Sequence, residues 1–209
     1  MIEVYSTPTA NGQKVHIALE ETGLAYRARM VDLQKGEHRD PAFLAVNPLG
    51  KLPAIVDPDG PGGTPLALGE TGAIVLYLCR KAGRFLAETQ REQAELEYWA
   101  FAVSASLAMP LAMQFYHSTL APEKLDWAVA AMTDGAHRAL GAFEQHLAKV
   151  EYLVGDRFTA ADMLLYPHLA TSAQRLPGAL SALPALSAYA ARIGARPGVL
   201  GRGRKKGAE

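Results

Sequence analysis

The chain has a single cysteine, Cys79, no excess of either charge and no long apolar run. One thiol excludes an intramolecular disulfide, a Cys-x-x-Cys redox pair and a zinc site made of thiolates. Lys plus Arg and Asp plus Glu number 21 each, so no overall field favours nucleic acid or an anionic membrane. No run approaches the ~20 apolar residues of a membrane span, and residues 2–5 show no signal-peptide pattern. We therefore expect a cytoplasmic protein with neither a nucleic-acid nor a membrane partner.

The rest of the composition is that of an ordinary globular protein. Of the 209 residues, 49% are hydrophobic and 20% charged, which suits one large domain or two small ones with a buried core. The basic residues gather only in the glycine-containing tail, at Arg202, Arg204, Lys205 and Lys206. A solvated terminus explains such a cluster more simply than a binding arm does.

The periodicity of apolar residues changes near residue 85. Before that point, alternating segments predict strands at 2–5, 26–31, 54–56 and 65–68. Helical patterns occupy about 12–22, 40–44 and 71–83, so the order is β-α-β-α-β-β-α, an α/β sheet domain of thioredoxin type. From 88 to 200 the pattern is helical throughout. The sequence predicts an α/β thioredoxin-like domain over 1–83 and an all-α helical domain over 90–209, with a cleft where they meet.

The most specific pattern lies in residues 47–78, where a loop ends at Pro53 and a helix begins at Glu70 and Thr71. A helix N-terminus offers free N–H groups to a carboxylate, and the carboxylate of Glu70 would pair with an ammonium. The two groups together predict a site that holds both ends of an amino acid. This arrangement resembles the glutathione site of the glutathione transferase family, whose thioredoxin-like domain carries Pro-Ala and Glu-Ser/Thr elements in this order.

A second motif extends the resemblance into the helical half. Thr159 and Asp162 match a capping box, which the family carries in the central helix of its helical domain. The resemblance then covers nearly the whole chain. It implies the glutathione transferase architecture, glutathione as co-substrate without a metal, and a homodimer.

Glutathione chemistry requires a thiolate, although a free thiol has a pKa of about 8.5. A helix N-terminus and a hydrogen-bond donor lower that pKa. The turn at residues 7–14 resembles the bacterial Nu class of disulfide-bond oxidoreductases, in which a Thr-x-Asn-Gly turn replaces the usual catalytic hydroxyl. The resemblance, together with the downstream site, makes Thr9 and Asn11 the catalytic residues. Without that site, the preferred interpretation of this turn would be that Asn11 caps the helix and Thr9 fills the turn. Tyr5 is expected to pack in the sheet.

Further glutathione contacts follow from the same resemblance. The Leu52–Pro53 bond is trans by default, but the family makes it cis, and the backbone of Leu52 would then bind the cysteinyl part of glutathione. Lys51 and His38 would lie near the glycyl carboxylate, although exposed lysines and loop histidines are more often simply solvated. Glu70 and Thr71 would hold the γ-glutamyl end, with an ordinary N-cap as the alternative.

The helical half would supply the pocket for the second substrate, with Met113 and Tyr116 as its lining. Residues 125–132 contain no basic residue. Nu-class proteins place an arginine there that helps hold a second glutathione moiety, so binding of glutathione disulfide is not implied for this chain. Cys79 lies in an apolar helix and reads as a buried, inert thiol, and the histidines are too scattered for a metal site.

These observations predict a glutathione transferase whose thiolate attacks a small hydrophobic electrophile, as in detoxification, or a small disulfide. The alternative from another class is a non-enzymatic module of the same fold that binds proteins. Such modules commonly lose the Glu-Ser/Thr pair or the turn donors, and this chain retains both. A glutathione-dependent isomerase would favour a serine-rich first turn, of which Ser6 alone is present.

Overall fold

The computed structural model describes residues 1–201, which divide into two compact units. The first unit is Met1–Leu86 together with the segment from Arg196 onward, and the second is Ala87–Ala195. The return of the chain to the first unit was not part of the division expected from the sequence. It ends in α9 (Pro197–Gly201), which packs on α1 (Ala10–Thr22). The basic cluster of the tail, Arg202, Arg204, Lys205 and Lys206, lies outside the described residues.

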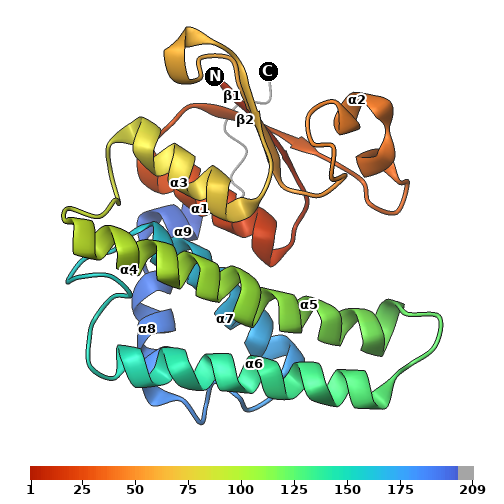
Figure 1. The fold of residues 1–209 in the computed structure, drawn as a ribbon, viewed down its shortest axis with the longest axis vertical. Coiled ribbons are helices and arrows are strands. Elements are labelled where there is room, and N and C mark those ends of the chain that lie inside the picture. Colours follow the sequence, from red (N-terminus) through yellow and green to blue (C-terminus); the bar gives the residue numbers. More distant parts are fainter. Residues whose placement is uncertain (202–209) are drawn as a thin grey trace. The chain divides into compact units, whose positions relative to one another are not determined.

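The first unit is built on a four-stranded mixed sheet of order β2-β1-β3-β4. β1 (Ile2–Ser6) is parallel to β2 (Tyr26–Met30) and antiparallel to β3 (Ala54–Asp57), which is antiparallel to β4 (Leu66–Leu68). The helices α1 and α3 (Thr71–Ala82) lie side by side (Figure 1). Short helices occupy the connections: η1 (Glu37–Arg39), α2 (Pro41–Leu44) and η2 (Pro61–Gly63). The element order is the predicted β-α-β-α-β-β-α.

The residues of β1 alternate between buried and partly exposed positions, and this anchoring fixes where the next turn of the chain begins. Ile2, Val4 and Ser6 are buried while the residues between them are partly exposed, as the two-residue period of a half-covered strand requires. The apolar faces of α1 and α3 complete this core, with Val15 and Ile74 fully buried. A fully buried aliphatic side chain contributes about 1.5–3 kcal/mol relative to an exposed one, so this core holds the turn between β1 and α1 in a fixed place.

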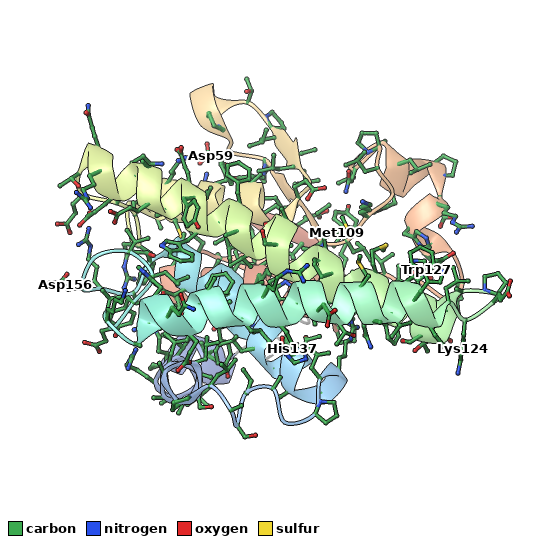
Figure 2. The ribbon with its side chains drawn as sticks, turned by 60° about the horizontal axis from the view of Figure 1, so that its bottom comes forward. Asp59, Met109, Lys124, Trp127, His137 and Asp156 are labelled. Carbon is green, nitrogen blue, oxygen red and sulfur yellow. The ribbon has the colours of Figure 1, made fainter. Side chains whose placement is uncertain are left out.

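The second unit contains only helices among its described elements. Its first helix runs without interruption through α4 (Gln90–Phe101), the π-helical stretch η3 (Ala102–Ala108), α5 (Met109–Phe115) and the π-helical stretch η4 (Tyr116–Leu120). It is followed by α6 (Asp126–Leu147), α7 (Ala160–Arg175) and α8 (Pro184–Gly194). Several large side chains stay in solvent, among them Met109 on α5 and Trp127 on α6, which are 53% and 74% exposed (Figure 2).

One helix of the described chain, Gln90–Leu120, is long and apolar enough by composition to cross a membrane, which the sequence analysis did not expect. A single helix of this kind is weak evidence for a membrane span, because core helices of soluble proteins can share its length and composition; 33% of its most apolar window is buried inside the protein.

The predicted capping box at the start of α7 is present. The Thr159 N–H donates to Asp162 Oδ2 over 2.7 Å, and the carboxylate also accepts from the Leu153 N–H (3.0 Å) and the Tyr189 hydroxyl (2.9 Å). Burial raises the pKa of Asp162, while these donors act in the opposite direction. The capping residue thereby connects α7 to α8 and to the loop before α7.

Candidate functional site

The turn between β1 and α1 presents Thr9 as the N-cap of the helix. Its backbone is extended (φ −122°, ψ 166°) and its Oγ1 accepts the Gly12 N–H at 3.2 Å. The alternative in which Asn11 caps this helix is therefore wrong. A hydroxyl accepts through its lone pairs and donates through its hydrogen. Since no described residue accepts the Thr9 hydrogen, capping leaves that donor available to a ligand.

Gly12 brings the first turn of α1 close to the strand end. A Cβ atom at this position would collide with the Thr7 carbonyl oxygen and the Ser6 Oγ, so only glycine fits. The glycine of the Thr-x-Asn-Gly pattern is thus explained by close packing.

Asn11 occupies the first turn of α1 and is half-buried. Its Oδ1 accepts a hydrogen bond from Lys14 Nζ at 3.0 Å. Lys14 is only 1% exposed, and burial lowers its pKa to about 7 against the opposing field of Glu70. Lys14 has no role predicted from the sequence, although its place on the same helical stripe as Val15 and Ala18 is a signal of burial.

The loop before Pro53 is held by Asn47, another residue that the sequence analysis left without a role. Asn47 is 3% exposed; its Nδ2 donates to the Lys51 carbonyl (2.7 Å) and its Oδ1 accepts the Leu49 N–H (3.2 Å). A Cβ at Gly69 would lie 2.9 Å from the same Nδ2. Asn47 therefore joins this loop to the turn that precedes α3.

The Leu52–Pro53 peptide is cis, as the resemblance led us to expect. Neither the N–H nor the carbonyl of Leu52 forms a hydrogen bond within the described chain. Both backbone groups are consequently available for an extended peptide ligand, which leaves the Leu52 side chain without a required identity.

Glu70 is the N-cap of α3, and its side chain makes no capping hydrogen bond. Its φ of 60° lies in the region that favours glycine, and non-glycine residues held there cost about 1–3 kcal/mol. The side chain is exposed, and the buried Thr71 opens the helix beside it. A carboxylate next to a helix N-terminus is therefore present as predicted.

The remaining predicted contacts lie further along the chain. His38 is in η1, where its Nδ1 is buried without a partner among the described residues, and its carbonyl oxygen would lie 3.3 Å from a Cβ at Gly50. η1 therefore adjoins the loop that carries the exposed Lys51. Met113 and Tyr116 belong to the second unit, and their role as lining of an electrophile pocket stays a prediction.

A hollow of about 610 Å³ opens on the first unit. It is lined by Thr7, by residues 30–35 and by Glu37. None of the predicted glutathione contacts lines it, so the candidate site is defined by its hydrogen-bonding groups instead.

Two other side chains lie where the sequence analysis placed them. The Tyr5 hydroxyl donates to Glu3 (3.2 Å) and its ring packs 5.7 Å from that of Phe43, so it belongs to the sheet. Cys79 is fully buried, and burial raises its pKa to about 12. Within the described residues, no group of His, Cys, Asp and Glu side chains could hold a metal ion.

Comparison with known families gives two matches in chain order. The model "Glutathione S-transferase, N-terminal domain" matches residues 10–81, and "Glutathione S-transferase, C-terminal domain" matches residues 105–197. The chain belongs to the glutathione S-transferase family. The first match covers every predicted glutathione contact except Thr9, which lies one residue before it.

Individual proteins similar to this chain are described as glutathione transferases or as a disulfide-bond oxidoreductase. The disulfide-bond oxidoreductase YfcG of Escherichia coli K12 is 36% identical over 94% of this chain and 92% of its own length. A glutathione transferase family member from Pseudomonas fluorescens, solved with two glutathione molecules bound, has a TM-score of 0.89 at 34% identity, covering 95% of this chain and 90% of its own. A glutathione transferase from Pseudomonas putida, solved with one glutathione disulfide per subunit, has a TM-score of 0.87 at 29% identity over 95% and 89% of the two chains.

Proposed function

We propose that this glutathione transferase binds glutathione on its first unit and uses the thiolate to reduce a small disulfide. One observation carries the proposal. The N-cap and first turn of α1 hold two side-chain donors, the Thr9 hydroxyl and the Asn11 amide, at the positive end of the helix. Both donors keep a hydrogen that no described residue accepts, as stabilisation of an incoming thiolate requires.

Each part of the glutathione molecule would have a binding group on the first unit. The Glu70 carboxylate would pair with the γ-glutamyl ammonium, and the first N–H groups of α3 with Thr71 would hold the γ-glutamyl carboxylate. The N–H and carbonyl of Leu52 would bind the cysteinyl amide in the manner of an added strand. His38 and Lys51 would face the glycyl carboxylate. The cysteinyl sulfur is then directed towards Thr9 and Asn11.

The chemical step is a thiol–disulfide exchange. Thr9 and Asn11 stabilise the thiolate, which attacks one sulfur of the substrate disulfide; that S–S bond breaks, and the departing thiolate takes a proton from water. A second glutathione thiolate then attacks the mixed disulfide, which releases the second substrate thiol and forms glutathione disulfide. The protein contributes orientation and a lowered sulfur pKa and forms no covalent bond itself.

Conjugation is the second candidate activity, and one observation favours it. Residues 125–132 carry no basic side chain that could help hold a second glutathione. The same bound thiolate would attack an electrophilic carbon, form a C–S bond and expel a leaving group, for which one glutathione suffices. Met113 and Tyr116 would line the space for that substrate.

We also propose a cytoplasmic homodimer. The single buried cysteine suits a reducing compartment. Tyr98 and Phe101 are 63% and 72% exposed and lie three residues apart on one face of α4, and large exposed apolar groups of this kind often mark an interface. Light scattering of the purified protein, with Phe101→Glu as the disrupting variant, tests this assembly.

The test of the function is glutathione-dependent reduction of a small mixed disulfide by the wild type and by Asn11→Ala. Loss of one preorganised donor lowers kcat by about 10²–10³ in comparable sites, and we expect at least a tenfold loss here. Gln13→Ala, in the same turn, is the matched control and should retain activity. Glutathione binding without disulfide turnover would point to conjugation, and absence of glutathione binding would support the non-enzymatic module.

A further inference from the structure

A buried lysine lies directly behind the thiolate-stabilising turn. Lys14 Nζ donates to Asn11 Oδ1 at 3.0 Å, three residues apart on α1, and Lys14 is 1% exposed. Burying an ammonium is costly, so proteins place one in the interior only where a partner accepts its hydrogens. Here the accepting partner is the side chain that we assign to the thiolate.

That hydrogen bond determines which way the Asn11 amide points. An ammonium has three donors and no acceptor, so it can face only the oxygen of an amide. With Oδ1 turned towards Lys14, the Nδ2 group is turned away from it, and no described residue accepts its hydrogens. A neutral neighbour that both donates and accepts would allow the amide to flip, presenting an oxygen to the thiolate and repelling it.

We propose that Lys14 is a positioning residue that holds the Asn11 amide with its N–H groups directed at the sulfur of bound glutathione. The inference rests on the proposed function, because it assigns a cause to the orientation of one of its two donors. Lys14 does not touch the sulfur and acts through Asn11.

The charge on Lys14 makes this orientation dependent on pH. The charged group that acts on Lys14 from another described element is Glu70, at the start of α3, and its field raises the lysine pKa. Burial is the larger effect and brings the pKa to about 7. Above that pH the amine gains a lone pair that can accept from Nδ2, so the preference for the productive orientation weakens in the protein without glutathione.

The decisive experiment is a double-mutant cycle on the pKa of the bound glutathione thiol, titrated by the ultraviolet absorbance of the thiolate. The four proteins are the wild type, Asn11→Ala, Lys14→Met and the double variant. Methionine keeps most of the buried stem, and it removes both the donors and the cost of burying an ammonium. We expect each single variant to raise the thiol pKa and the double variant to match Asn11→Ala, because Lys14 has no effect once the amide is gone.

Each other outcome has a separate meaning. A rise in Lys14→Met that persists in the Asn11→Ala background would show that the lysine charge acts directly on the sulfur, which overturns positioning. An unchanged thiol pKa in Lys14→Met, with a rise in Asn11→Ala, overturns this inference and leaves the proposed function intact. An unchanged thiol pKa in Asn11→Ala removes Asn11 from the thiolate site and overturns both.

A second measurement does not require glutathione. In the wild-type protein, the NMR signal of the Asn11 side-chain amide should titrate with a midpoint well below the ordinary lysine pKa of about 10.4, and the titration should vanish in Lys14→Met. Lys14→Gln, which can both donate and accept, should give a thiol pKa between those of the wild type and Lys14→Met. An Asn11 signal that does not respond to Lys14 ionisation would contradict the proposed contact.

Discussion

One role of Thr9 is seen in the structure and a second is proposed, and one set of substitutions separates the two. Its Oγ1 accepts from the Gly12 N–H as the N-cap. Its hydrogen has no acceptor among the described residues and is the one that we propose for the glutathione sulfur. Thr9→Val removes both roles and Thr9→Ser keeps both. Thr9→Asp keeps only the cap, because a carboxylate accepts N–H groups as well as threonine does but has no hydrogen to donate.

The expected magnitudes differ for the two roles. A hydrogen bond to a charged group contributes about 1.5–3 kcal/mol, and one pKa unit corresponds to about 1.36 kcal/mol, so loss of the hydroxyl should raise the bound thiol pKa by about 1–2 units. Thr9→Asp should raise it further, since its charge repels the thiolate. At neutral pH the thiolate population, and with it kcat/KM, should fall by about 10- to 100-fold. Loss of the cap in Thr9→Val should cost about 0.5–2 kcal/mol of stability, whereas Thr9→Asp should stay near the wild type.

The assay pairs thiol titration with urea unfolding for the same four proteins. Thr9→Asp should combine wild-type stability with the lowest activity, and Thr9→Ser should match the wild type in both measurements. A Thr9→Val protein that loses stability yet keeps the pKa of its bound thiol would refute the second role, because the hydroxyl would then be a cap and nothing more.

Three further predictions follow from buried polar groups. Asn47→Ala removes two hydrogen bonds and should cost about 1–3 kcal/mol and weaken glutathione binding in calorimetry, whereas the exposed Leu49→Ala should change neither. Asp162→Ala leaves the donors that it satisfies without a partner and should cost about 3–5 kcal/mol, which calorimetry would record as a fall in Tm of about 10 °C. Burial acts to raise the pKa of Asp57, but the hydrogen bonds from Tyr77 and Lys81 leave it lowered overall, so its contribution to stability is present at neutral pH and is lost as the pH falls through the folded pKa. Asp57→Asn should therefore flatten the loss of stability on acidification below about pH 4, and unchanged acid sensitivity would refute that assignment.

Local sequence patterns were sufficient for the elements of the first unit and for the start of α7. Strand alternation, glycine stops and the Thr159–Asp162 spacing each act within a few residues, so each could be interpreted without the fold. The return of the chain from Arg196 to the first unit could not be predicted in this way. It depends on a contact between α9 and α1, which lie at opposite ends of the sequence.

The residues of the candidate site also fall into two groups, those that a local motif reveals and those that only the folded structure reveals. Glu70, Thr71 and the Leu52–Pro53 bond were recognised because they form a motif. Lys14 and Asn47 were missed because their importance comes from burial, which lysines and asparagines seldom show. Only the place of Lys14 on the apolar stripe of α1 hinted at it. The alternative that made Asn11 the N-cap was wrong for a related reason: Thr9 and Asn11 both suit the position, and only the backbone decides between them.

Burial of polar groups offers an independent argument for where the first unit functions. Its buried polar residues in the described chain are Ser6, Lys14, Thr22, Asn47, Asp57 and Thr71. Apart from Thr22 at the end of α1 and Asp57 at the end of β3, they lie in, or directly behind, one of the three turns that would surround glutathione: the turn before α1, the loop before Pro53 and the start of α3. An interior polar group is costly unless it is hydrogen-bonded, so packing alone does not explain polar residues at these positions. Their concentration around three turns that are distant in sequence is what a site needs if its outer donors must be held in fixed directions.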